Sequence, residues 1–389
     1  MSHRRKAHRR ASVLVSATAL VTLAACGSPS PAGANDDEPI RIGVPTSLTG
    51  AFGTYGRMIR AGLEAGLHCS TDGTNQVGGR PVEFVYADDG GDAAKALASA
   101  TGMVGDGVDI LAGTVSSGIA VKLAAFAEQQ DVLLITGAPG IDELTGANSH
   151  TFRASRQARQ EAAAMSTLLP QASGKTVVLA QDYSFGQKYV STITDVFGAR
   201  RAKVQPVLVP LNAREFTPYA RQVTEADPDL LIVVYYGDSA PAMWQALAQQ
   251  GVLNSTTVAS VLVEKANWAI YGPAAEKITF VSHYYPGAPG GAMNTCLTKQ
   301  VPNADLSTHD GFVAAQMIVH ALSTADPDDV AGMAKALDGW SFDAPKGPMT
   351  IRAGDHALLQ DMYVTSLRRK GGKLVATPHG VVPRVEIAP

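Results

Sequence analysis

One short polar loop, residues 116–118, holds the residue types best suited to binding a small anion. Ser116 and Ser117 carry hydroxyl donors, and Gly118 lets a ligand approach the backbone closely. A helix that begins here has unpaired N–H groups at its first turn, and these attract negative charge. A serine at such a position also commonly caps a helix. The residues alone therefore leave two interpretations open, an anion site and a simple helix cap.

Two motifs of enzymes are incomplete in this chain. Residues 174–176 read Gly-Lys-Thr like the end of a phosphate-binding loop, but its first glycine is replaced by Leu169. Residues 237–239 read Gly-Asp-Ser, yet a nucleophile elbow needs glycine where Pro241 stands. No catalytic residue is assigned, and the chain is not expected to be an enzyme.

The acidic and histidine residues do not predict a metal site either. Asp88, Asp89 and Asp92 lack the spacing and the final glutamate of a calcium loop, which favours a strand-end turn followed by a helix cap. The nine histidines show no paired zinc-ligand spacing. We therefore expect no metal and no cofactor.

Aromatic side chains gather after several predicted strands. Rings at the carboxyl ends of strands build apolar walls with polar tips, as a small-molecule cleft requires. The alternative is that some of these rings pack an interface between lobes. The residues are Tyr55, Tyr183, Phe185, His283, Tyr284 and Tyr285.

Two series of alternating strands and helices predict an α/β fold with two doubly wound parallel sheets. Each series is long enough to form its own core, so a cleft between two lobes is expected. The predicted strands of the first series are 40–46, 81–87, 109–115 and 132–136, and those of the second are 176–181, 204–209, 230–235, 257–262 and 278–281. Two further helices, 309–325 and 328–337, and extended segments at 349–351 and 362–366 follow.

The first 25 residues predict an export signal. They contain five basic and no acidic residues, followed by an apolar run that is too short for a retained membrane helix. Residues 23–26, Leu-Ala-Ala-Cys, are similar to a bacterial lipobox, in which Cys26 is lipidated and becomes the mature N-terminus. The alternative is a plain signal peptide that is cut elsewhere.

Residues 26–38 have the Gly, Ser and Pro content of a flexible tether. The whole chain has a net charge of −3, and removal of the basic signal leaves it more acidic. That balance excludes nucleic acid as an expected partner. Two cysteines then remain, Cys69 and Cys296, and in an oxidising compartment they either pair or stay free.

Seven segments of the chain carry a resemblance to a known family. They are IRIGVPTSLTGAFGTYG at 40–56, GRPVEFVYADDGGDAAKA at 79–96, DILAGTVSSG at 109–118, LLITGAPGIDELTG at 133–146, TFR at 151–153, QDYSFG at 181–186 and FTPY at 216–219. In order and spacing they resemble the leucine/isoleucine/valine-binding group of type I periplasmic binding proteins, which supplies the substrate-binding components of ABC importers. The resemblance extends from about residue 39 to the C-terminus.

The resemblance implies that the chain crosses between two lobes three times. The crossings fall near residues 151–157, 282–284 and 359–363. Lobe 1 would then comprise residues 39–155 and 284–360, and lobe 2 residues 156–283 and 361–389. Cys69 and Cys296 would share a lobe, which favours a disulfide between them.

The resemblance also implies a set of ligand-binding residues. Ser117, with Ser116 beside it, and backbone groups of Ala138 to Gly140 would bind a carboxylate; Gly140 replaces the threonine that usually donates there. Tyr55 and Phe185 match aromatic positions, Ser239 matches a tyrosine, and Glu264 matches, with an offset of one residue, the acid that binds an α-ammonium group. Tyr183 would complete the cage, with His283 and Tyr284 near the hinge.

The sequence thus predicts a lipid-anchored extracytoplasmic binding protein that delivers a small ligand to an ABC permease. The incomplete amino-acid clamp leaves open an amino acid or another small carboxylate, aromatic or aliphatic. The alternative function is a ligand-sensing receptor lipoprotein of the same fold that is not coupled to transport.

Overall fold

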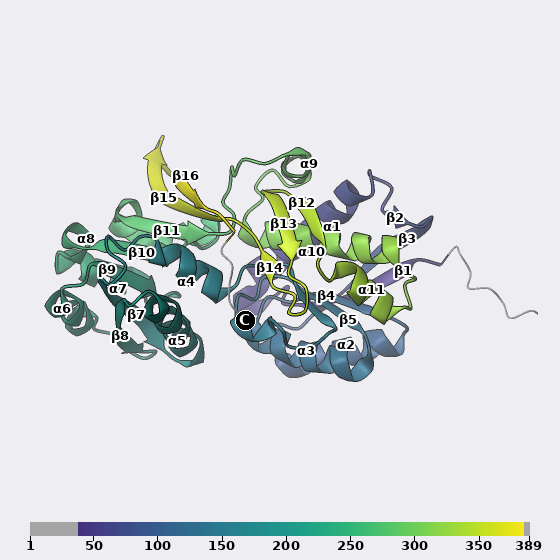
Figure 1. Cartoon of the computed structure of the whole chain (residues 1–389), viewed down its shortest axis with the longest axis horizontal. Coiled ribbons are helices and arrows are strands. Elements are labelled where there is room, and N and C mark those ends of the chain that lie inside the picture. The colour runs from purple at the N-terminus through teal and green to yellow at the C-terminus, as the bar shows by residue number, and fades with distance from the viewer. Residues whose placement is uncertain (1–37, 385–389) are drawn as a thin grey trace, which may run out of the picture. The chain divides into compact units, whose positions relative to one another are not determined.

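The computed structural model describes residues 38–384, except the side chain of Ser184 (Figure 1). The predicted signal at 1–25, the lipidation residue Cys26 and all but the last residue of the predicted tether lie outside the described residues. No helix among residues 38–384 has both the length and the apolar character needed to span a membrane.

The first sheet is built from the N-terminal third of the chain. Its strand order is β2-β3-β1-β4-β5-β6, and all neighbours are parallel except β2 and β3. Strands β4 and β5 are buried along their whole length, as strands covered on both faces must be. The strands are β1 (Ile40–Thr46), β2 (Gln76–Val77), β3 (Arg80–Asp88), β4 (Ile110–Gly113), β5 (Leu133–Thr136) and β6 (Thr151–Arg153). The helices between them are α1 (Gly53–Ser70), α2 (Ala93–Gly105) and α3 (Ser117–Gln130), with short turns η1 (Gly50–Phe52) and η2 (Asp142–Leu144).

The second sheet has the order β16-β15-β11-β10-β9-β7-β8. Its strands are β7 (Lys175–Asp182), β8 (Lys203–Pro210), β9 (Leu230–Val234), β10 (Thr257–Val261), β11 (Ile278–Ser282), β15 (Met362–Lys370) and β16 (Lys373–Val382). Its helices are α4 (Ala158–Ser166), α5 (Ser184–Ala199), α6 (Thr217–Ala226), α7 (Ala240–Gln249), α8 (Val252–Ser255) and the 3-10 segment η3 (Lys265–Lys277).

The C-terminal hairpin makes this second sheet mixed, whereas the sequence predicted parallel strands. Strand β15 runs antiparallel to β11, and β16 runs antiparallel to β15 (Figure 1). Gly371 and Gly372 form the turn with positive φ values of 58° and 80°, which favour glycine. This tight turn returns the chain directly, so no crossover helix is needed.

A helical segment returns to the first sheet before the final hairpin. It comprises α9 (Ala292–Gln300), α10 (Leu306–Thr324), α11 (Val330–Leu337) and a small antiparallel sheet of β12 (Ser341–Ala344), β13 (Gly347–Ile351) and β14 (Leu358–Leu359). Apolar residues of α10, α11, β13 and β14 share one core with strands β1, β4 and β5. The two α/β lobes predicted from the sequence are therefore present, since strands β1–β6 and β7–β11 form separate sheets and β15 and β16 join the second. The residue bounds of the lobes stay a prediction.

Helices α1 and α10 lie against each other, and glycines make this close approach possible. A Cβ atom at Gly62 would lie 2.1 Å from the carbonyl oxygen of Thr308, and one at Gly311 would lie 2.3 Å from that of Ile59. Nearby, Cys69 at the end of α1 forms a disulfide with Cys296 of α9, with 6.1 Å between their Cα atoms. The packing fixes α1, whose first turn carries Tyr55.

Candidate functional site

The loop after β4 turns sharply before helix α3 begins. Gly113 and Thr114 both have positive φ, 82° and 58°, and the second value is unusual for a threonine. Ser116 is the N-cap residue but makes no capping hydrogen bond with its side chain. Within residues 38–384, neither the Ser116 nor the Ser117 hydroxyl has a hydrogen-bond partner, so the simple cap interpretation does not describe this loop.

The loop after β5 lies directly beside the loop after β4. The N–H of Gly137 donates to the carbonyl of Gly113 at 2.6 Å. A Cβ at Gly137 would lie 3.0 Å from the carbonyl oxygen of Thr114, so any larger residue would crowd the two loops. Both loops leave the carboxyl ends of neighbouring parallel strands, where ligands of such sheets bind.

Residues of the segment after β6 donate hydrogen bonds to all three carbonyl groups of the loop at 138–140. Arg156 Nη1 donates to the carbonyl of Ala138 at 2.7 Å, and Arg153 Nη2 donates to that of Pro139 at 3.0 Å. The N–H of Ala158 donates to the carbonyl of Gly140 at 2.8 Å. The backbone N–H groups of Ala138 and Gly140 have no partner among the described residues. Two backbone donors of this loop thus stay free, and their role in binding a ligand stays a prediction.

Arg156 belongs to a buried network that the sequence analysis did not identify. Its Nε donates to Glu161 Oε1 at 3.0 Å, and the hydroxyl of Tyr189 donates to the other oxygen of this buried carboxylate. Burial lowers the pKa of Arg156, but the negative charges of Glu161, Asp310 and Glu264 outweigh that effect and raise it. Arg156 is therefore a permanent cation in a partly desolvated site.

Tyr55 of lobe 1 contacts lobe 2 directly. Asn267 Nδ2, in η3, donates to the Tyr55 hydroxyl oxygen at 2.8 Å. Burial, followed by the charge of Glu264, raises the pKa of Tyr55 to about 12. Tyr55 and Glu264 therefore lie near each other, on opposite sides of the boundary between lobes. Asn267 had no motif in the sequence that could have identified it.

Glu264 is a buried carboxyl group at the start of η3, with 8% of its surface exposed. It accepts a hydrogen bond from the Ser307 hydroxyl. Burial raises its pKa to about 7, and the charge of Asp305 acts in the same direction. The group therefore changes charge near neutral pH.

Replacement of Glu264 by glutamine is expected to alter the pH dependence of stability. The pKa is about 4.5 in a model compound and about 7 in the folded chain, so its stabilising contribution is complete below 4.5 and is lost as pH rises through 7. Glu264→Gln cannot lose this proton. The variant should gain roughly 2–3 kcal/mol relative to the wild type between pH 5 and pH 8.

Urea unfolding of both proteins at the two pH values measures this difference. The matched control is Glu128→Gln, at an exposed position of α3. Any change between pH 5 and pH 8 that Glu264→Gln shows beyond that of Glu128→Gln is then due to the buried carboxyl group. A pH-independent difference for Glu264→Gln would contradict the assignment.

The other residues predicted in lobe 2, Tyr183, Phe185 and Ser239, differ in their surroundings. Phe185 is half-buried, with ring centroids 5.9 Å from Tyr183 and 5.0 Å from Tyr189. It lines a pocket of about 230 Å³ together with Ile141, from the loop that follows Gly140. The hydroxyl of Ser239 is 2.9 Å from that of Tyr235, so it already has a partner. The ligand-binding role of each remains a prediction.

His283 and Tyr284 are buried where the chain leaves β11. His283 Nε2 lies 2.9 Å from Asp310 Oδ1 on α10, and the Tyr284 hydroxyl donates to Asn294 Oδ1 at 3.1 Å. Tyr284 also stacks on His309, with ring centroids 4.8 Å apart. These contacts connect the second crossing to α9 and α10, which suits a role at the hinge.

His283, His309 and Asp310 are the residues that could together hold a metal ion in the described part of the chain. Asp310 Oδ1 is already shared by both histidines, at 2.9 and 3.4 Å. Burial lowers the pKa of His283 well below its usual value, and the charges of Arg156 and Lys346 act in the same direction. Those cations disfavour a metal ion as well, so we interpret the cluster as a hydrogen-bonded part of the hinge.

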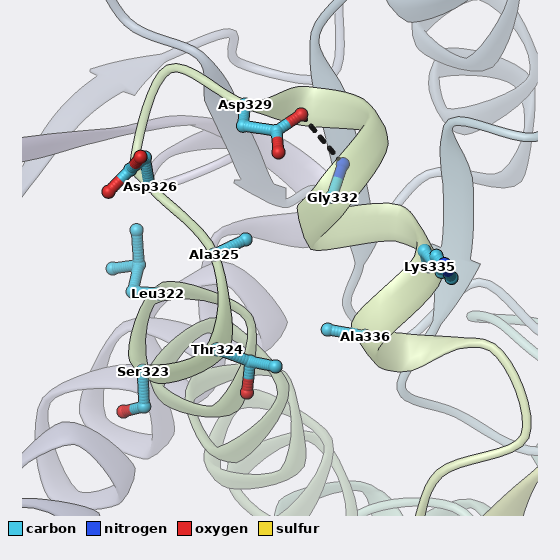
Figure 2. Close-up of a pocket in the computed structure, with 9 residues that line it drawn as sticks. All are labelled: Leu322, Ser323, Thr324, Ala325, Asp326, Asp329, Gly332, Lys335 and Ala336. Carbon is cyan, nitrogen blue, oxygen red and sulfur yellow. Dashed lines mark hydrogen bonds between the residues drawn. The ribbon is translucent and has the colours of Figure 1, made fainter.

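A larger pocket, of about 710 Å³, lies between the end of α10 and α11 (Figure 2). Asp329 lines it and caps α11, accepting from the N–H of Gly332 at 2.9 Å, as Figure 2 shows. Ser323, Asp326 and Lys335 lie around it. None of the predicted ligand-binding residues lines this pocket, so we do not assign the site to it.

Comparison with known proteins agrees with this architecture. A family model described as "Periplasmic binding protein" matches residues 39–373. "Leu/Ile/Val-binding protein homolog 3" of Brucella melitensis is 25% identical over 324 residues, which cover 80% of this chain and 86% of that protein.

Two solved structures are similar to this chain along most of their length. An ABC-type branched-chain amino acid transporter protein of Rhodopseudomonas palustris has a TM-score of 0.80 at 25% identity, covering 89% of this chain and 97% of that one. A solute-binding protein of an ABC transporter from R. palustris, in complex with benzoate, has a TM-score of 0.73 at 25% identity, with 89% and 97% covered.

Proposed function

Because this chain belongs to the periplasmic binding protein family, we propose that it is the lipid-anchored, substrate-binding component of an ABC importer. Its ligand is a small carboxylate, either an amino acid or an aromatic or aliphatic acid, bound between the lobes. Cys26 carries the lipid that holds the protein outside the cell membrane, and permease subunits receive the ligand. The protein binds its ligand and does not convert it.

One observation supports this function above the others: lobe 1 carries polar donors without partners, and a side-chain hydrogen bond also joins this lobe to lobe 2. The free hydroxyls of Ser116 and Ser117 and the free N–H groups at 138 and 140 belong to lobe 1. The Asn267 to Tyr55 hydrogen bond joins lobe 1 to lobe 2. A ligand that contacts both lobes favours their closure, because it binds the closed state more tightly.

The names of similar proteins are consistent with both ligand types. One solved structure is described as a branched-chain amino acid transporter protein, and another contains benzoate. A thermal-shift screen of the purified protein with amino acids, aromatic acids, aliphatic acids and small amides tests the proposal. A ligand at about 100 times its dissociation constant adds roughly 2.7 kcal/mol of stability. Stabilisation by no carboxylate in that set would contradict the proposed ligand class.

The Ser117→Ala variant should bind the ligand found in this screen more weakly by about 1–3 kcal/mol. The reason is that a buried carboxylate would lose one hydroxyl donor. Isothermal titration calorimetry measures the change, with Ser255→Ala, at an exposed position of α8, as the control that keeps full affinity. Unchanged affinity in Ser117→Ala would remove this hydroxyl from the site.

A further inference from the structure

Arg156 fills the space beside the loop at 138–140 that a side chain of residue 140 would otherwise take. A Cβ atom at Gly140 would lie 3.1 Å from the Arg156 Cζ and 3.4 Å from its Nε and Nη1. The backbone of Gly140 is not in the left-handed region, so conformation does not require glycine here. An added Cβ atom would instead crowd the guanidinium group, which would have to move by a few tenths of an ångström.

Two of the three guanidinium nitrogens are already used inside the protein. Nε donates to Glu161 and Nη1 to the carbonyl of Ala138. For Nη2, residues 38–384 supply no hydrogen-bond partner. The Arg156 side chain is 23% exposed, whereas the Glu161 side chain is fully buried. The guanidinium group is thus fixed in orientation on one side and open on the other.

An arginine in this position favours a carboxylate group as its ligand. The hydrogen bonds to Glu161 and to the carbonyl of Ala138 hold the planar group in place, so little side-chain entropy is lost when a ligand binds. A guanidinium group with a free nitrogen donates to a carboxylate oxygen through a charge-assisted hydrogen bond. The unpartnered N–H of Gly140 belongs to the loop whose Ala138 carbonyl the guanidinium group binds, so the same loop supplies a second donor.

We propose that Arg156, whose guanidinium group occupies the space beside Gly140, is a specificity-determining residue that binds the ligand's carboxylate through Nη2. This inference rests on the proposed function and narrows it. Recognition depends on the carboxylate group, and no α-amino group is needed. The site therefore selects small carboxylic acids against their amides.

Titration calorimetry of the purified protein tests this, using acid and amide pairs such as benzoate with benzamide, 4-methylpentanoate with its amide, and L-leucine with L-leucinamide. The wild type should bind at least one acid about 30-fold or more tightly than its amide. Arg156→Met should lose about 30-fold in affinity for that acid and little for the amide. Arg60→Met is the matched control, since Arg60 pairs with Glu64 on the exposed surface of α1. Its affinity should be unchanged.

Arg156 also supports the loop, so a second variant separates binding from folding. In Gly140→Thr/Arg156→Ala, the removed guanidinium leaves room for a hydroxyl donor at position 140. This double variant should recover part of the acid affinity that Arg156→Met loses, about fivefold or more. Thermal unfolding of each variant verifies that the fold is retained.

The outcomes distinguish this inference from the function on which it rests. If the wild type binds an acid and Arg156→Met binds it equally well, or if acid and amide bind equally, Arg156 is not the carboxylate donor and the proposed function stands. The same conclusion follows if Arg156→Met loses affinity and the double variant recovers none. If the wild type binds no acid of any pair, the proposed ligand class fails as well.

Discussion

The Gly62→Ala variant should lower the free energy of unfolding by about 3–4 kcal/mol, because its new methyl group meets the backbone of α10. The added carbon would lie 2.1 Å from the Thr308 carbonyl oxygen and 2.9 Å from the Phe312 amide nitrogen. Neither atom belongs to a side chain that could rotate away. The two helices would have to separate, and the tightly packed core they share with the first sheet would loosen.

Urea denaturation followed by circular dichroism measures this loss. Gly102→Ala is the matched control, because this glycine lies in helix α2 with nothing within 4 Å of an added Cβ. There the substitution should stabilise by roughly 0.5–1 kcal/mol, since alanine is the better helix former. Equal behaviour of the two variants would show that α1 and α10 do not pack this closely.

Removal of the disulfide is the second change with a large expected effect. Cys69→Ser/Cys296→Ser should reduce the free energy of unfolding by about 3–5 kcal/mol. The disulfide joins residues 227 positions apart, so it restricts the unfolded chain strongly. Both cysteines are replaced together because a single replacement would leave a reactive thiol.

The urea midpoint of the double variant, compared with that of the oxidised wild type, measures this contribution. Reductant supplies an internal control: it should shift the wild type towards the variant and leave the variant unchanged. Equal midpoints for the oxidised wild type and the variant would contradict the prediction. Detection of two free thiols in the wild type would show that the pair does not form.

The strands of both sheets were predictable because their residues follow simple patterns. Residues 133–136 and 230–234 are continuous apolar runs that only a covered sheet can bury, and the structure places them in β5 and β9. The C-terminal strand β16 was missed, although Gly371 and Gly372 signal a turn. Only one of its ten residues, Ala376, is buried, so no apolar run marks it.

The site was predicted in part, and the missed residues share a physical reason. Ser116 and Ser117 follow an apolar strand, a local pattern that indicates a strand-to-helix turn. Asn267 and Arg156 carry no such local signal. Their partners, Tyr55 and Gly140, come from other segments of the chain.

The sequence by itself determined the two α/β lobes, the polar loop at 116–118 and the family resemblance, because apolar periodicity and turn residues act over a few neighbouring positions. The tertiary structure alone decided which donors remain free. It uses every carbonyl of the 138–140 loop and leaves N–H groups unpaired. It also sets a guanidinium group against Gly140. Such pairings depend on distances between segments far apart in the chain, and hydrogen bonds act only at short range.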